Sequence, residues 1–200
     1  MTTLFLARHG RTEANANQVF QGRKGAGLDA VGREQAARLG DRVRGLGIVR
    51  LVSSDQERAV ETATIVNASL GLELELDQSL REVDVGSWSG LSYAEAEARF
   101  PDEWAAWSAG RDVRRGGGET YGELADRIAG ALDRVARKSA GAPTLVVTHG
   151  AALRSFVCRV LGIAPPGPKG LGGASNCGLT TVHWEDGGFR LLSWNIPVNT

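Results

Sequence analysis

The chain has 200 residues, of which 42% are hydrophobic and 23% charged, a composition typical of a globular protein with its own core. Its 23 basic and 23 acidic residues cancel to a formal net charge of +0, which excludes a chain-wide field that would attract nucleic acid or a membrane surface. Any affinity for anions therefore has to be local. We expect a single domain over residues 1–200, with neither nucleic acid nor a membrane among its partners.

The N-terminal segment and the two cysteines bear on where the protein resides. The apolar run 4–7 is too short for the hydrophobic region of a signal peptide, and Arg8 ends it. Cys158 and Cys177 lack the spacing of metal ligands, and both could be free thiols. We therefore expect a cytoplasmic protein.

Arg8, His9 and Gly10 end the first predicted strand. The apolar run before them is typical of a buried strand, and the glycine is typical of a turn. Ligands of open α/β sheets bind at the carboxyl ends of the strands, so a cation and an imidazole at this point indicate a candidate site. An isolated Arg-His-Gly is more often an exposed turn, but similar polar ends follow the apolar runs 51–52 and 145–147.

A polar loop that contains glycine follows over residues 11–30. Its side chains, which include Gln21 beside Gly22, could hydrogen-bond a ligand, although Asn15 taken alone is more typical of a turn. Asp29 can cap the next helix, whose apolar residues recur at helical spacing over residues 36–46.

Arg58 lies in the first turns of the following predicted helix. A strand over residues 48–52 precedes Ser53 and Ser54, and either serine can cap that helix. Free N–H groups at a helix N-terminus and a guanidinium together favour phosphate. Taken alone, however, Arg58 is better interpreted as a surface partner of Glu61.

Glu82 and Asp84, in the segment 80–90, are two candidates for a carboxylate of the site. The residues before them, 72–76, alternate as a half-exposed strand does. A carboxyl group of this kind is suited to proton transfer at a reacting oxygen. In an extended chain the two side chains share a face, so their spacing does not choose between them.

Residues 91–118 are predicted to form a small helical cap inserted into the alternation of strands and helices. They gather aromatic side chains with four arginines: Tyr93, Phe100, Trp104, Trp107, Arg99, Arg111, Arg114 and Arg115. The aromatic residues favour an apolar patch inside the cap, and a lid over the site is the functional alternative. The last three arginines could hold a second anionic group of a ligand or form a solvated cluster, and the sequence supports both interpretations equally.

The rest of the chain continues the alternation of helices and strands, which indicates the α/β class. We expect a helix from Glu119 or Thr120, a strand over 143–147, a helix over 153–161, and a hairpin of strands 176–184 and 189–194. His149 and Gly150 follow closely after the strand over 143–147, as His9 and Gly10 follow the first strand.

Together these motifs resemble the histidine phosphatase superfamily, whose fold is called phosphoglycerate mutase-like. The resemblance covers nearly the whole chain in the right order: Arg8-His9-Gly10 with Asn15, Ser53-Ser54 with Arg58, Glu82 with Gly86, Trp88 and Gly90, Gly117-Gly118-Glu119, and Thr148-His149-Gly150. It implies a three-layer α/β/α sandwich with a mostly parallel central sheet, into which residues 91–118 insert as the small helical cap.

The resemblance also implies a role for each matched residue. His9 would be the nucleophile that forms a phosphohistidine, and Glu82 rather than Asp84 would be the proton donor. The other expected site residues would hold the phosphoryl group, as Arg8, Arg58, Asn15 and a protonated His149, or contact the rest of the substrate, as Gln21, Gly22, Glu119 and Gly150.

The implied function is hydrolysis of a small-molecule phosphomonoester, with no metal and no cofactor, because arginines would supply the positive charge. A homodimer is the family-level expectation. One alternative is a phosphoglycerate mutase, although mutases of the family are generally longer, and another is an inactive relative that binds phosphorylated ligands. Near the C-terminus, Leu171-Gly172-Gly173 with Asn176, and the closing Trp194-Asn195, are similar to glucosyl-3-phosphoglycerate phosphatases and related sugar-phosphate phosphatases. The core motifs leave the substrate open.

Overall fold

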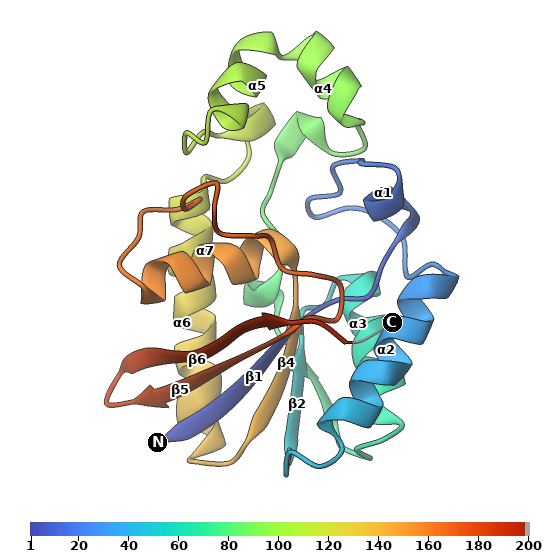
Figure 1. Cartoon of the computed structure of the whole chain (residues 1–200), viewed down its shortest axis with the longest axis vertical. Helices are drawn as coiled ribbons and strands as arrows, with labels where there is room; N and C mark the ends of the chain where they lie inside the picture. The colour runs from blue at the N-terminus through green and yellow to red at the C-terminus, as the bar shows by residue number, and fades with distance from the viewer. Residues whose placement is uncertain (199–200) are drawn as a thin grey trace.

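The structure of the protein, a computed structural model, describes residues 1–198 and contains a central sheet of six strands over this range (Figure 1). The strand order is β3-β2-β4-β1-β5-β6. The strands from β3 to β1 are parallel, whereas β5 is antiparallel to β1 and β6 is antiparallel to β5. The expected mostly parallel sheet is therefore confirmed. The strands are β1 (Thr2–Arg8), β2 (Arg50–Ser53), β3 (Leu74–Leu76), β4 (Thr144–Thr148), β5 (Leu179–Glu185) and β6 (Gly188–Ile196).

Helices on both faces of the sheet complete the expected three layers (Figure 1). Successive residues of a strand point to opposite faces, so Leu4 and Leu6 pack on the side of α6 and α7, and Ala7 packs on the side of α2 and α3. None of the helices within residues 1–198 combines the length and apolar content that crossing a bilayer requires. The covering helices are α2 (Ala30–Val43), α3 (Glu57–Asn67), α6 (Tyr121–Ser139) and α7 (Gly150–Val160).

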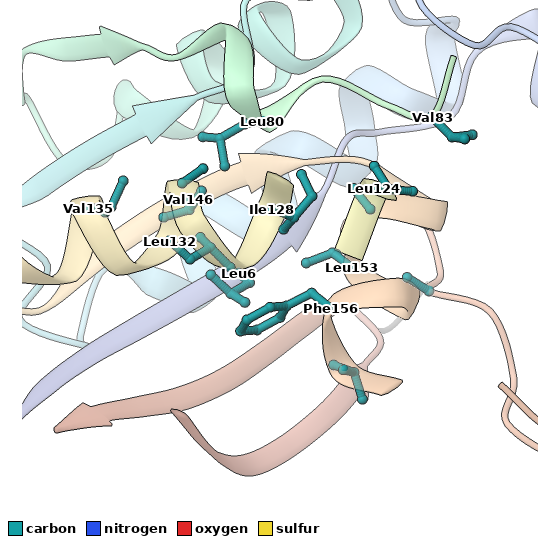
Figure 2. Close-up of a cluster of buried hydrophobic side chains, with 14 of the residues drawn as sticks. Leu6, Leu80, Val83, Leu124, Ile128, Leu132, Val135, Val146, Leu153 and Phe156 are labelled. Carbon is teal, nitrogen blue, oxygen red and sulfur yellow. The ribbon is translucent and has the colours of Figure 1, made fainter. Parts of the chain in front are cut away.

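The side chains of the core between the sheet and the helices α6 and α7 are buried, and Figure 2 shows how some of them pack together. Leu6 and Val146 from the strands meet Ile128 and Leu132 of α6 and Phe156 of α7, and all five side chains are buried. Each such side chain contributes about 1.5–3 kcal/mol relative to an exposed position. The core therefore holds β1 and β4 rigidly, and with them the polar residues that follow their carboxyl ends.

A helical cap lies beyond the carboxyl ends of the strands, at the top of Figure 1. It comprises α4 (Tyr93–Arg99), α5 (Pro101–Ser108) and a 3₁₀ turn (Arg115–Gly117). Its aromatic patch is centred on Phe20, whose ring centroid lies 4.6 Å from that of Tyr93, 5.1 Å from Trp88 and 5.4 Å from Trp107. Two further 3₁₀ turns, Gln78–Leu80 and Gly86–Trp88, flank the segment that leads into the cap.

Two segments depart from the expected elements. The strand predicted from Asn176 begins only at Leu179, because Cys177 has a φ of 56°, a left-handed conformation that interrupts regular strand geometry. A turn takes its place and brings Asn176 next to the end of β1. In the loop over residues 11–30, Thr12 caps the short helix α1 (Glu13–Ala16), which the sequence patterns did not predict.

Candidate active site

His9 follows β1 directly and is only 2% exposed. Its Nδ1 lies 2.7 Å from the carbonyl oxygen of Gly10. A carbonyl accepts and never donates, so Nδ1 carries the proton and Nε2 carries the lone pair in the neutral ring. Burial, reinforced by the charges of Arg8 and Arg58, holds the pKa of His9 well below its usual value and keeps the ring neutral at pH 7. A neutral imidazole with a free Nε2 is a nucleophile.

The backbone around His9 is fixed from three sides. Its N–H donates to the carbonyl oxygen of Thr148 at 2.9 Å, and its own carbonyl accepts from Nδ2 of Asn176 at 3.0 Å. A Cβ at Gly10 would lie 2.4 Å from the carbonyl oxygen of Gly32, so α2 approaches too closely for any other residue here. The turn after β1 therefore holds the imidazole in one place.

Arg8 and Arg58 bring positive charge to the same place without a carboxylate partner among residues 1–198. Arg58 is 1% exposed, and its two terminal nitrogens donate to the carbonyl oxygens of Lys24 and Gly22, both at 2.8 Å. Arg8 donates to the carbonyl oxygen of Ala174 at 2.7 Å. The Nε atoms of both arginines are buried and have no hydrogen-bond partner. Burial lowers the pKa of Arg58 to about 10, which leaves the guanidinium charged at pH 7.

His149 stands behind His9 as the N-cap of α7, and the two ring centroids are 5.2 Å apart. Its Nε2 pairs with the hydroxyl of Ser54 at 2.8 Å, while its buried Nδ1 has no partner. Burial is the main cause that holds the pKa of His149 well below its usual value, and Arg58, His9 and Arg8 add to it. The surrounding protein groups therefore favour the neutral ring, and the protonated His149 expected from the resemblance would need an added negative charge nearby.

Glu82, rather than Asp84, is the carboxylate that faces the site. Its two oxygens accept from the N–H groups of Ala151 and Ala152 in the first turn of α7, both at 3.0 Å. Its own N–H donates to the side-chain oxygen of Gln56 at 2.8 Å. Asp84 is turned away, where its carboxylate accepts from the N–H of Gly86 at 2.9 Å. The start of α7 thus positions both His149 and Glu82.

These side chains surround two neighbouring pockets. The inner pocket, of about 190 Å³, is lined by most of the predicted residues: Arg8, His9, Asn15, Gln21, Gly22, Arg58 and Glu82. The outer pocket, of about 630 Å³, shares Arg8, Glu82, Tyr93, Trp107, Tyr121 and Ala151 with it and is also lined by Gly150, Ser108, Arg154 and Lys169. Small-molecule sites usually measure about 300–1,000 Å³. The inner pocket therefore suits one small group, and the outer pocket suits the rest of a ligand.

His149, whose ring lies next to that of His9, lines neither pocket, and the same is true of Glu119. Its carboxylate accepts two hydrogen bonds from Arg127, at 2.8 and 2.7 Å. Arg127 in turn donates to the carbonyl oxygens of Ser79 and Arg81 at 2.9 Å each, just before Glu82. Glu119 therefore supports the segment that carries Glu82, and a longer ion pair of 3.7 Å joins it to Arg23 in the loop that follows Gly22.

Arg111, Arg114 and Arg115, which the sequence did not distinguish, occupy different environments in the cap. Arg115 is 3% exposed and lines the inner pocket. Arg114 is exposed and pairs with Glu123, and Arg111 is also exposed. Charge alone did not distinguish them, whereas the glycines after Arg115 could have signalled a tightly packed turn.

Several residues at the site had no predicted role there. Ser54 was expected to cap a helix and instead pairs with His149, and Gln56 holds the backbone of Glu82. Tyr121, Arg154 and Lys169 line the pockets although they belong to no motif. They come from α6, α7 and the loop after α7, so only the folded chain brings them together.

The side chains around the inner pocket are suited to bind an anion and to attack it with a nucleophile. A neutral Nε2 and two guanidinium groups converge on a small pocket, and a carboxyl group that can transfer a proton lines the same pocket. Within residues 1–198 there is no group of three or more His, Cys, Asp or Glu side chains placed to hold a metal ion.

Comparisons with known proteins agree with this geometry. The sequence matches the histidine phosphatase superfamily (branch 1) over residues 4–197. It is 32% identical over 199 residues to a probable phosphoglycerate mutase of Salmonella paratyphi B. The aligned region covers 97% of this chain and 90% of that protein.

Solved structures extend the likeness. A mycobacterial glucosyl-3-phosphoglycerate phosphatase superposes with a TM-score of 0.88 and 28% identity, over 98% of this chain and all of that chain. Bacillus stearothermophilus YhfR superposes with a TM-score of 0.92 and 25% identity, over 98% of each chain. The chain is therefore an enzyme of the histidine phosphatase superfamily, branch 1.

Proposed function

We propose that this protein hydrolyses a small phosphorylated metabolite through a phosphohistidine on His9. The observation that carries the proposal is the inner pocket, where a buried neutral imidazole meets two guanidinium groups that form no ion pair within residues 1–198 and whose Nε donors are free. A phosphomonoester brings about two negative charges. Its non-bridging oxygens would accept hydrogen bonds from the free Nε–H groups of Arg8 and Arg58. Phosphorus would then remain accessible to attack by Nε2 of His9.

In the first step Nε2 attacks phosphorus, the bond between phosphorus and the ester oxygen breaks, and Glu82 gives its proton to the departing alkoxide. In the second step Glu82 takes a proton from water, the hydroxide displaces His9 from phosphorus, and inorganic phosphate leaves. His9 and Glu82 then have their starting protonation states. Burial and, to a lesser degree, the arginine charges keep His149 neutral in the free protein. The bound dianion offsets those charges and adds a negative charge nearby, so His149 would gain a proton while the phosphoryl group is bound.

A phosphoglycerate mutase is the second candidate, because the Salmonella relative carries that name as probable. A mutase would use the same phosphohistidine but return the phosphoryl group to a retained intermediate. Chain length does not separate the two, since the aligned region spans 90% of that relative. The mycobacterial relative is a phosphatase, and water as the acceptor needs no retained intermediate, so we favour hydrolysis.

The test measures phosphate release from a panel of phosphomonoesters in excess EDTA, with His9→Ala beside the wild type. The panel contains phosphoglycerates, glucosyl-3-phosphoglycerate, sugar phosphates, nucleotides and phosphoamino acids. Release that survives the chelator and depends on His9 is the expected result. Interconversion of 2- and 3-phosphoglycerate without net release would establish the mutase instead. Phosphate binding without turnover or phosphoenzyme would indicate a binding protein.

A further inference from the structure

The guanidinium of Arg115 is buried and forms no ion pair with a carboxylate of residues 1–198. Its side chain lines the inner pocket at 3% exposure, and its Nε and one terminal nitrogen are buried without a hydrogen-bond partner. Within the described part of the chain, no carboxylate lies within 4.0 Å of it, whereas neighbouring Arg114 pairs with Glu123. Buried charges in proteins are normally paired. A guanidinium placed in a pocket without a partner therefore points to a ligand that supplies one.

Aromatic rings hold this guanidinium but do not satisfy its donors. Its central carbon lies 4.6 Å from the ring centroid of Tyr121, 5.7 Å from that of Trp107 and 6.0 Å from that of Phe20. The faces of these rings attract a cation. They do not replace the strong oxygen acceptors that N–H groups need, so the planar fork keeps its capacity for a carboxylate or a phosphate.

The backbone at Arg115 is locked to the segment that follows Glu82. A Cβ at Gly86 would lie 1.9 Å from the carbonyl oxygen of Gly116, and one at Gly118 would lie 2.2 Å from that of Asp84. Gly116 also adopts a left-handed φ of 55°. The two segments therefore touch backbone to backbone, which keeps Arg115 in a constant position relative to Glu82. Such a rigid support is what a specific binding residue requires.

Arg115 belongs to the cap side of the pocket, opposite the strand ends. In an in-line displacement the leaving oxygen points away from His9 and toward its proton donor, Glu82. The remainder of the substrate then extends toward the cap. Tyr93 lines the inner pocket together with Arg115 and Arg8. Arg115 is thus placed for the alcohol part of the substrate.

We propose that Arg115 binds a second anionic group, a carboxylate or a second phosphate, on the alcohol part of the substrate. The proposal rests on the proposed function, which supplies the phosphoryl position and the direction of the leaving group. Arg115 is then a specificity-determining residue: it favours phosphomonoesters that carry two anionic groups over neutral phosphomonoesters of the same size.

The test compares three small esters: 3-phosphoglycerate, glycerol 3-phosphate and propane-1,3-diol bisphosphate. The first two differ only in that one ends in a carboxylate and the other in a neutral alcohol. The third ends in a second phosphate and lacks the hydroxyl on the middle carbon. The wild type should show a higher kcat/KM for at least one doubly anionic ester than for glycerol 3-phosphate. Arg115→Gln should reduce that preference by about 10- to 100-fold, the range for one charge-assisted contact.

Two further variants separate recognition from structure. Arg114→Gln removes the exposed neighbouring charge and should leave the preference within about twofold, as surface charges usually do. Arg115→Lys keeps the charge but not the fork, and the preference should fall between those of wild type and Arg115→Gln. If Arg115→Gln does not fold, Arg115→Lys carries the test. An equal loss of kcat/KM on all three esters, together with a lower Tm, would make Arg115 structural and overturn the proposal.

A binding measurement keeps this proposal distinct from the proposed function. Calorimetry on His9→Ala, with and without Arg115→Gln, compares the affinities of the three esters without turnover. A doubly anionic preference that depends on Arg115 supports the proposal even if the wild type releases no phosphate. Release that depends on His9, with the same ester preference in wild type and Arg115→Gln, overturns the proposal and leaves the hydrolase standing.

Discussion

The two sides of the pocket are built in different ways. On the strand side, His9, Arg58 and His149 follow three neighbouring strands, and backbone carbonyls hold the arginines. On the cap side, aromatic faces surround Arg115, and the indole of Trp107 donates a hydrogen bond to the hydroxyl of Tyr121. The strand side is therefore suited to one unvarying chemical step. The cap side supplies shape and charge for the variable part of a substrate.

This contrast predicts that a change on the strand side abolishes the reaction for every substrate, and His9→Ala is the most severe. We expect kcat to fall by roughly 10⁴- to 10⁶-fold, because the nucleophile itself is lost. Single-turnover phosphate release measures the effect. His183→Ala is the matched control, since His183 lies half-buried on β5 away from both pockets. Equal activity of the two variants would remove His9 from the mechanism.

The next largest effect should come from Glu82→Gln, which keeps the shape of the side chain and removes its proton. An alkyl phosphate should lose about 10²- to 10⁴-fold in kcat, while p-nitrophenyl phosphate, whose leaving group needs no proton, should lose much less. Steady-state kinetics on both esters measure the difference. Asp84→Asn is the control and should change neither rate by more than a few-fold. Equal losses on the two esters would contradict the role of Glu82 as proton donor.

Acidification should lower the free energy of unfolding through the two buried histidines of the strand side. His9 and His149 have pKa values well below the usual 6.5, so the unfolded chain takes up protons that the folded rings refuse. Their contribution to stability is complete above about pH 6.5 and falls by about 1.4 kcal/mol per ring for each pH unit below it. Urea unfolding at about pH 7 and 5.5, in a buffer without phosphate, measures the loss. His149→Asn should roughly halve the loss, and an unchanged pH dependence would contradict this account.

The smallest effect should come from Glu119→Gln, which breaks the ion pair with Arg127 behind Glu82. Because Glu119 lines neither pocket and supports this segment from outside, we expect kcat to fall by about 3- to 10-fold with KM nearly unchanged, and the free energy of unfolding to fall by about 1–3 kcal/mol. Steady-state kinetics and urea unfolding measure the two effects. A large rise in KM without loss of stability would indicate direct substrate contact, as the sequence motif had suggested.

The two sides also differ in how far the sequence predicts them. The strand side was accessible, because an apolar run that ends in polar residues marks both the strand and its functional end, as at Arg8 and His149. The choice of Glu82 over Asp84 came only from the family motif, since the spacing left both open. The structure shows the physical basis of that choice: the first N–H groups of α7 hold Glu82, and Asp84 caps its own turn.

The cap was predictable as a helical segment with an aromatic patch, but its functional residue was not. Arg111, Arg114 and Arg115 have the same charge and lie close together in the sequence. Only Arg115 is buried, next to the close backbone contact between Gly116 and Gly86, which are thirty positions apart in the chain. Asn176 belonged to a C-terminal motif, but its contact with His9 was not predicted, because the left-handed Cys177 replaces the start of a predicted strand by a turn.

The central claim is that His9 carries the phosphoryl group, and trapping the phosphoenzyme tests it most directly. The enzyme is mixed with its best ester, quenched in alkali, in which phosphohistidine survives, and analysed by mass spectrometry of the intact chain and its peptides. We predict one added phosphoryl group on His9, absent from His9→Ala and lost on acid treatment. Rapid turnover by the wild type with a phosphoryl group on another residue, or undiminished turnover by His9→Ala, would contradict the account.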